Sequence, residues 1–453
     1  MSSVVDADLA HRAVEVARAA GAGDAEAYAT ETEMREVRTH GGGIESLSAA
    51  TQRGVGIRAW LEGRVGYAFG TDLSTEGVAA IAARAVEAAR VADPDEFAGP
   101  PVETGGVPAL AGLSDPSVAE WETPRVAELA LAVERSAQGF DQRVTGVEQA
   151  VYFDSSERVA IASSRGAGGG YETSSCYAYA QALAGDESGR ETGLGFGIAR
   201  GPAGLDPAAI GREAGERATE MIGSRKPESR ACPVVLDATV AASFVGLLGR
   251  GLGADAVQRG RSPFAALLGE PVASEAFALR DDGLDPDGFA AAPIDDEGVP
   301  RRRTPLIEDG RLLTFLYDTY TARRGGAAST GNAGRSGYRT PPGVSASNLI
   351  VSPGSLGFEE LLREAGEGVL VTDVAGLHAG VNPVSGAFSV GASGRAIRGG
   401  ELAEPLREFT IAGELVSMLG AVRAVGATPR WVPFGDSISV PPLLIGEMTV
   451  GGS

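Results

Sequence analysis

Apolar residues recur at helical spacing in several segments of the 453-residue chain. The first such segment ends near Gly21, a residue suited to a helix C-cap. Another begins at Thr123-Pro124, which supplies a hydroxyl N-cap and a proline for the first turn. The pattern predicts helices over residues 8–20, 78–88, 123–133, 207–222 and 239–252.

From Ala25 to Phe69 the pattern changes to short β-type runs. Residues 54–60 and 64–69 flank Leu61-Glu62-Gly63, which predicts a hairpin. More strands are expected between about 144 and 183, with a glycine-rich interruption at 166–170. A second hairpin is predicted where the strands 305–307 and 312–316 flank a turn at 308–311.

A polar stretch with two prolines, residues 224–233, marks the predicted domain boundary. We therefore expect one domain over 1–225 and a second over 226–453. The 65 glycines suit a turn-dense β architecture, which is what the second half shows after residue 252. The predicted fold class is α+β: an N-terminal mixed α/β domain followed by a mostly antiparallel β domain.

The composition is that of a soluble globular protein, with 43% hydrophobic and 22% charged residues and a mean hydropathy of zero. The first residues do not show the basic and apolar segments of a signal peptide. No run approaches the roughly 18–20 apolar residues that a membrane span needs. These observations predict a cytoplasmic protein without a membrane partner.

The formal net charge is −21, and Lys226 is the only lysine. A surface of this sign gains nothing from a polyanion, so direct nucleic-acid binding is not expected. The two cysteines, Cys176 and Cys232, lie far apart in sequence. In a reducing compartment we expect two buried thiols instead of a disulfide.

The residues that could bind a metal are few. The three histidines, His11, His40 and His378, stand alone, and no H-E-x-x-H or C-x-x-C pair occurs. Zinc needs three or four nitrogen, sulfur or oxygen ligands, and paired ligands on a helix need a spacing of about one turn. We therefore expect no metal site within this chain.

Serine hydrolysis is an alternative that the sequence leaves open. It would pair Ser385 or Ser393, each followed by glycine, with His378 as the base. Turn chemistry explains these Ser-Gly pairs better. Seven acidic residues beside Arg301-Arg302-Arg303 are interpreted as a solvated loop without the spacing of a calcium-binding loop; they are Asp281, Asp282, Asp285, Asp287, Asp295, Asp296 and Glu297.

Several long motifs, in a constant order, resemble proteins of the TldE/PmbA family. They include D-A-V-Q-R-G-R-S at 255–262, D-D-E-G-V-P at 295–300 and T-G-N-A-G-R at 330–335. The most specific is G-V-N-P-V-S-G-A-F-S at 380–389, which continues to T-I-A-G at 410–413. In the first half, G-V-G-I-R at 54–58 also matches, so the resemblance covers essentially the whole chain.

The resemblance implies a comparison with TldD-type subunits, which carry H-E-x-x-x-H on the helix before the D-x-V segment and a cysteine near the C terminus. Val245 and Arg250 stand at the histidine positions, and Gly246 stands at the position of the general-base glutamate. The C-terminal run 435–440 contains no cysteine. Valine and glycine offer no ligand atom and arginine stays protonated. The helix is thus identified as a degenerate catalytic helix.

By resemblance, this chain is the metal-free, non-catalytic subunit of a heterodimer whose TldD-type partner carries zinc. It would wall the chamber and help hold unfolded or flexible peptides. Candidate peptide-binding residues, in glycine-rich turns that match family motifs, are Asn332, Arg335, Asn382 and Ser385; turn chemistry explains each of them individually as well. The alternative is a homodimer that binds peptides without hydrolysing them.

Overall fold

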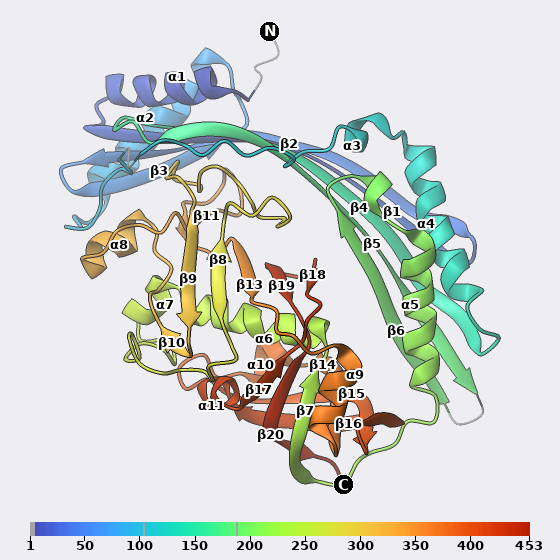
Figure 1. The fold of residues 1–453 in the computed structure, drawn as a ribbon. Helices are drawn as coiled ribbons and strands as arrows, with labels where there is room; N and C mark the ends of the chain where they lie inside the picture. The colour runs from blue at the N-terminus through green and yellow to red at the C-terminus, as the bar shows by residue number, and fades with distance from the viewer. Residues whose placement is uncertain (1–4, 103–104, 187–188) are drawn as a thin grey trace.

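The computed structural model describes residues 5–102, 105–186 and 189–453. It confirms the α+β class: a curved sheet with helices on its outer side forms the N-terminal half and arches over a β-rich C-terminal half (Figure 1). The strands of the arch all precede residue 225, and the strands of the other sheets all follow it. No helix in the described ranges has the length and apolar character to cross a membrane.

The arching sheet is antiparallel, with the strand order β3-β2-β1-β4-β5-β6. Its strands are β1 (Asp24–His40), β2 (Gly43–Leu61), β3 (Arg64–Gly70), β4 (Val144–Ser163), β5 (Gly168–Asp186) and β6 (Gly189–Ala199). The β2–β3 hairpin is confirmed, because Glu62 and Gly63 both have the positive φ of a two-residue hairpin turn. The prediction of short runs was wrong, since β1 and β2 have 17 and 19 residues.

Helices cover the outer side of the arch at its two ends. One end packs Leu9, Ile57 and Ile81 together, and the other packs Val133, Tyr152 and Ala214. The helices are α1 (Ala7–Ala19), α2 (Thr75–Val91), α3 (Ser117–Glu120), α4 (Thr123–Gln138) and α5 (Pro207–Glu220), with a short 3₁₀ turn η1 (Pro202–Gly204). At α4 the N-cap is Glu122 instead of the predicted Thr123, which already belongs to the helix.

The C-terminal half contains a sheet that closes on itself. Its order is β16-β15-β14-β7-β20-β17, and an additional pairing of the edge strand β16 with β20 closes these strands into a barrel, with β17 attached to β20. The β7–β14 pair is parallel and the other pairs are antiparallel. The strands are β7 (Arg230–Leu236), β14 (Gly368–Ala375), β15 (Ala387–Arg398), β16 (Glu401–Glu414), β17 (Val422–Val425) and β20 (Leu443–Gly451).

A second C-terminal sheet, of order β10-β9-β8-β13-β19-β18, lies between the barrel and the arch (Figure 1). Its strands are β8 (Leu279–Asp282), β9 (Arg303–Glu308), β10 (Arg311–Leu312), β13 (Asn348–Val351), β18 (Arg430–Val432) and β19 (Ser437–Val440), and β11 (Ala333–Gly334) pairs separately with β12 (Gly343–Val344). The predicted strand 312–316 ends already at Leu312, because Leu316 turns away to bridge Gly253.

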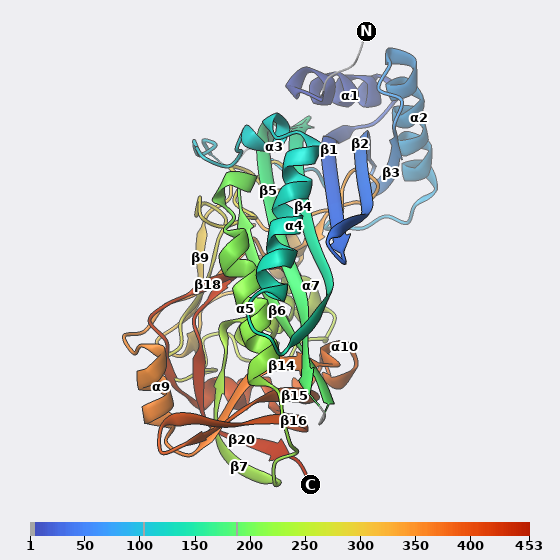
Figure 2. The same ribbon diagram turned by 90° about the vertical axis from the view of Figure 1, so that its right-hand side faces the viewer.

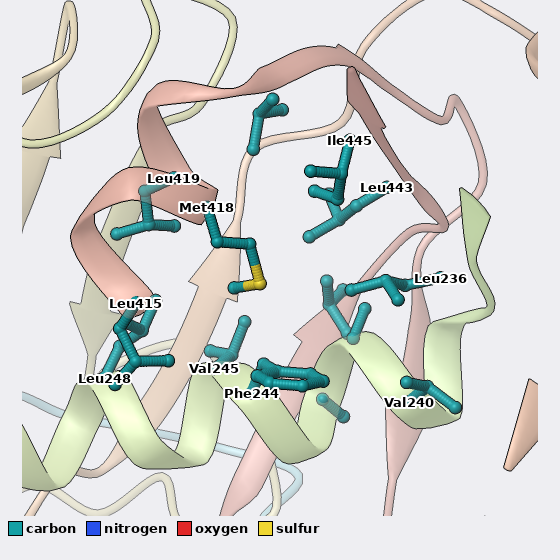
Figure 3. Close-up of a cluster of buried hydrophobic side chains, with 14 of the residues drawn as sticks. Leu236, Val240, Phe244, Val245, Leu248, Leu415, Met418, Leu419, Leu443 and Ile445 are labelled. Atoms are coloured by element: carbon teal, nitrogen blue, oxygen red, sulfur yellow. The ribbon is translucent and has the colours of Figure 1, made fainter. Parts of the chain in front are cut away.

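Helix α6 (Ala238–Gly251) lies at the centre of the C-terminal core, within one residue of the predicted 239–252. The Asp237 carboxylate caps it by accepting from the Val240 N–H at 2.8 Å. Figure 3 shows Phe244 and Val245 pointing into a cluster with Met418. The remaining helices are α7 (Ala254–Gln258), α8 (Thr319–Gly325), α9 (Phe358–Ala365), α10 (Leu377–Gly380) and α11 (Leu415–Gly420).

Both cysteines are free and buried, as predicted. Cys176 lies beneath α4 and α5, and Cys232 lies in the core around α6. Burial raises the pKa of the Cys176 thiol to about 12.

Candidate functional site

The C-terminal end of α6 carries the three positions at which the sequence comparison expects lost catalytic groups. Val245 is buried in the core, where its side chain packs near Met418 (Figure 3). A Cβ at Gly246 would lie 3.3 Å from an Asp436 carboxylate oxygen. Arg250 is exposed, and its guanidinium lies 3.9 Å from the same Asp436 carboxylate. Val245 therefore faces the core, whereas Gly246 and Arg250 both lie beside Asp436.

The residues at these positions do not fit a zinc ion. Valine and glycine present no donor atom, and a guanidinium presents only N–H groups and positive charge. Among the residues that the structure describes, no three His, Cys, Asp or Glu side chains are grouped so that they could hold a metal ion.

A pocket of about 500 Å³ opens beside the end of α6. Positively charged, negatively charged and apolar side chains line it, and they come from segments far apart in the sequence. The polar part of its lining includes Arg250, Asp255, Arg261, His378 and Asp436. Such a mixed wall suits a ligand that offers both main-chain polar groups and side chains, as a peptide does.

A second pocket of about 270 Å³ continues the first, because Asp255 and Val344 line both. Its wall combines the arch with the C-terminal half, because Trp60 from β2 and Tyr320 from α8 both line it. The Arg58 guanidinium lies 4.9 Å from the centre of the Trp60 ring. We call the two adjoining pockets together the α7 groove, after the helix that carries Asp255.

The strand edge at Val344 faces this groove. The Ser345 N–H donates to the Asn332 carbonyl at 2.8 Å, so Val344 and Ala333 form a pair without direct hydrogen bonds. The N–H and C=O of Val344 therefore point away from β11, and Val344 itself lines both pockets. In the described residues β12 pairs with no strand other than β11.

Asn332 and Arg335, two predicted peptide-binding residues, are buried and bonded within the protein. The Asn332 amide donates to Asp281 at 2.7 Å and to the Ser345 carbonyl at 3.1 Å. The Arg335 guanidinium donates to Glu26 and, at 3.0 Å, to the Asp296 carbonyl. Asn332 thus holds the strand edge in place, and Arg335 joins the two halves of the chain.

Asn382 and Ser385, the other two, lie on an exposed turn. The Asn382 side-chain oxygen accepts from the Val384 and Ser385 N–H groups, and the Ser385 hydroxyl accepts from the Ala387 N–H. These contacts shape the turn, whose neighbour Pro383 lines the α7 groove. Peptide contact by any of the four residues stays a prediction.

The candidate serines and the candidate base, His378, are not hydrogen-bonded to one another in the described residues. His378 lies on α10 beside the α7 groove, whereas Ser393 lines another pocket together with Arg395 and residues of β5 and β6. The structure gives no hydrogen bond from His378 to Ser385 or Ser393 within the described ranges. The geometry therefore does not support a catalytic triad here.

The acidic stretch between 281 and 297 is not a solvated loop, and that prediction was wrong. Five of its carboxylates are buried: Asp281, Asp282, Asp295, Asp296 and Glu297. Main-chain donors compensate for their burial, as at Asp295, which accepts from the N–H groups of Glu297, Val299 and Ala333. Ile294 and Val299 lie on either side of the last three acidic residues and are buried. These two apolar residues could have indicated that the carboxylates between them are buried as well.

These carboxylates meet arginines at the junction of the arch with the C-terminal half. Arg58 of β2 donates to both Glu26 of β1 and Glu297, the latter at 2.8 Å. Burial would raise the pKa of Glu297, but the Arg58 guanidinium and the hydrogen bonds from Thr319 together outweigh burial and hold this pKa below its usual value. Burial, together with repulsion from Glu297, raises the pKa of Asp295 to about 7. This buried ionic network therefore supports the wall of the α7 groove.

Three family models match successive parts of the chain. Residues 25–89 match the PmbA/TldA metallopeptidase domain 1, residues 116–222 the central domain and residues 229–452 the C-terminal domain. The chain belongs to the PmbA/TldD family.

Family members with similar sequences span almost its full length. The metalloprotease PmbA of Escherichia coli O157:H7 is 28% identical over 94% of this chain and 92% of its own, and the PmbA homolog of Haemophilus influenzae is 27% identical over 97% and 95%. A crystal structure from Thermotoga maritima, titled as a modulator of DNA gyrase, superposes with a TM-score of 0.90 at 26% identity over 98% and 99% of the chains. TldE from Thermococcus kodakarensis shares the fold, with a TM-score of 0.89 at 22% identity over 98% and 99%.

Proposed function

We propose that this PmbA/TldD family chain is the non-catalytic subunit of a two-subunit, cytoplasmic zinc metallopeptidase. A TldD-type subunit would supply the zinc, the general base and the activated water. This chain would form part of the chamber wall and hold extended peptide in the α7 groove.

The proposal rests on the residues that occupy the three α6 positions. Val245 is a core residue, Gly246 has no side chain, and Arg250 points its positive charge at Asp436. Chemistry by the isolated chain would need several ligands and a base that these residues cannot provide. The names of the relatives, metalloprotease PmbA, nevertheless place the family among metallopeptidases. Both observations are explained if the TldD-type subunit supplies the catalytic metal and this chain helps to hold the peptide.

The groove supports the peptide-holding role. The free N–H and C=O of Val344 can pair with the backbone of an extended peptide, which is a recognition mode that tolerates varied sequences. Side chains on alternate faces of the peptide would enter the two pockets on either side of Val344. Flexible or unfolded peptides fit this mode, because most of the backbone of a folded substrate is already hydrogen-bonded.

The test is a peptidase assay on the chain alone, on a TldD-type subunit alone and on the mixture, with an unfolded substrate such as casein. The proposal expects no cleavage by this chain and clearly faster cleavage by the mixture than by the TldD-type subunit alone. Equal rates for that subunit alone and for the mixture would contradict a role for this chain in the chamber. Chelator-sensitive cleavage by this chain alone would contradict the non-catalytic assignment.

A further inference from the structure

The second pocket of the α7 groove, with a volume of about 270 Å³, is lined by the edge of the arch and by two helices of the C-terminal half. Figure 2 shows that edge, where β2 and β3 lie next to α2. Trp60 of β2 and Tyr320 of α8 contribute aromatic side chains to the wall, and Asp255 and Gln258 of α7 contribute polar ones. A pocket of this size suits one long side chain better than a larger ligand.

A buried carboxylate in this wall has one oxygen without a donor. Asp318 caps the N terminus of α8, and its exposed fraction is 5%. Its Oδ1 accepts from the Thr321 N–H at 2.7 Å and from the Thr321 hydroxyl at 2.6 Å. Its Oδ2 accepts from no donor in the described residues, and protein atoms do not seal it off completely. Burial, together with repulsion from Glu297, raises the pKa of Asp318. A cation in the pocket would therefore stabilise the ionised carboxylate.

The arginines of the wall do not compensate this charge. Arg58 donates to Glu297 and to a second buried carboxylate, so its positive charge is already shared between two anions. Arg259 and Arg324 are exposed, and water and salt screen exposed charges. Asp318 therefore leaves the buried part of the wall with an uncompensated negative charge.

A second acceptor lies close to Asp318. The Gln258 side-chain amide donates to the carbonyl of Thr321, the residue that Asp318 caps, at 2.8 Å. The Gln258 side-chain oxygen is buried and has no donor in the described residues. A guanidinium carries five N–H donors in one plane and also stacks on aromatic rings. It therefore offers donors for both acceptors and a flat face for the ring of Tyr320.

We propose that this pocket binds an arginine side chain of the extended peptide, with Asp318 as the residue that determines the specificity. The peptide main chain pairs with Val344, which lines the same pocket, and a side chain beside this pairing enters the pocket. Lysine fits less well, because an ammonium group lacks the planar set of donors. This inference deepens the proposed function and rests on it, since it names the kind of peptide that the α7 groove holds.

The experiment compares two unstructured fluorescent peptides that differ at one central residue, which is arginine or the uncharged citrulline of the same length. The full-length chain should bind the arginine peptide about tenfold more tightly, as expected for hydrogen bonds to a charged group. Asp318→Asn should bind both peptides equally, because asparagine caps a helix as well as aspartate does but carries no charge. Thermal unfolding verifies that the variant is folded.

Asp309→Asn is the matched control, because Asp309 is exposed on the β9–β10 turn, lines neither pocket and has a positive φ that asparagine tolerates. It removes the same charge and should keep the preference for arginine. Equal binding of the two peptides by the wild-type chain, a preference that survives Asp318→Asn, or an equal loss in Asp309→Asn would overturn the inference. In each of these cases the binding of peptide itself leaves the proposed function intact. A chain that binds neither peptide would contradict the peptide-holding role as well.

Discussion

Arg335 donates a hydrogen bond to Glu26, and both side chains are completely buried although 309 residues separate them in the sequence. Glu26 belongs to β1 of the arch, and Arg335 follows β11 in the C-terminal half. Arg58 joins the same carboxylate and extends the contact to Glu297. The orientation of the arch over the α7 groove therefore depends on buried charges that compensate one another.

Replacing Arg335 by methionine should destabilise the protein by about 3–5 kcal/mol, because Glu26 loses a buried cationic partner and the Asp296 main-chain carbonyl loses its donor. Thermal and denaturant unfolding measure the loss. Arg398→Met is the matched control: Arg398 also pairs with a carboxylate, Glu404, but on the surface, so little change is expected. Equal losses for both variants would contradict a buried network at the junction.

The resemblance to TldD-type subunits places Val245 and Arg250 at the two histidine positions of their motif, and the structure predicts opposite responses to replacement by histidine. Val245→His should cost about 2 kcal/mol or more, since it places an imidazole in a packed apolar core. Arg250→His should be nearly neutral, because this side chain is exposed and makes one long ionic contact. Thermal unfolding with and without added zinc checks both, and neither variant should be stabilised by the metal. Stabilisation by zinc would show a latent ligand set.

Glu157 on β4 predicts part of the pH dependence of stability. Burial, reinforced by the negative charge of Asp296, raises its pKa, while the hydroxyls of Thr30 and Thr32 donate to it. The unfolded chain then releases this proton at a lower pH than the folded protein does. The contribution of Glu157 to stability is therefore fully present below its unfolded pKa, near 4.5, and is lost as the pH rises through the folded value.

Glu157→Gln removes this titration and keeps an oxygen that can accept from both threonines. The variant should be more stable than wild type at pH 8, and the difference should shrink as the pH falls toward 4.5. Denaturant unfolding across that range measures it. A variant that loses stability at pH 8 would contradict an unfavourable buried charge at Glu157.

Val344→Pro tests peptide pairing in the α7 groove. Proline removes the N–H that points into the groove, while the Ser345 N–H can still bond to Asn332, so the β11–β12 pair should survive. Binding of an unstructured fluorescent peptide should weaken about fivefold to tenfold, as expected from the loss of one hydrogen bond. Val344→Ala keeps the N–H and should bind almost as wild type does. Equal weakening by the two variants would assign the effect to the side chain instead of the backbone.

Local signals in the sequence predicted the parts of the fold that local chemistry determines. The β2–β3 hairpin follows from Glu62-Gly63, and α6 follows from apolar spacing after the capping Asp237. The degenerate positions on α6 could be named from the motif that follows them. Their surroundings could not, because the core that surrounds Val245 is completed by Met418 from another helix.

The buried acidic network was missed for a physical reason. Glu297 is neutralised by Arg58, which lies 239 residues away, and no local pattern reveals such a partner. A run of charges by itself favours solvent exposure, which explains the wrong prediction. The same applies to Asn332 and Arg335: their turns were recognised, but their roles depend on Asp281 and Glu26, which approach only in the folded chain.

We propose that this chain holds no catalytic metal and that a TldD-type partner does. The most direct measurement is zinc content by elemental analysis, on the purified chain and on its complex with a TldD-type subunit, after exposure to zinc and removal of the unbound metal. The account predicts no stoichiometric zinc in the chain alone and about one zinc ion per complex. Stoichiometric zinc in the isolated chain would contradict it, because a ligand set would then exist apart from Val245, Gly246 and Arg250.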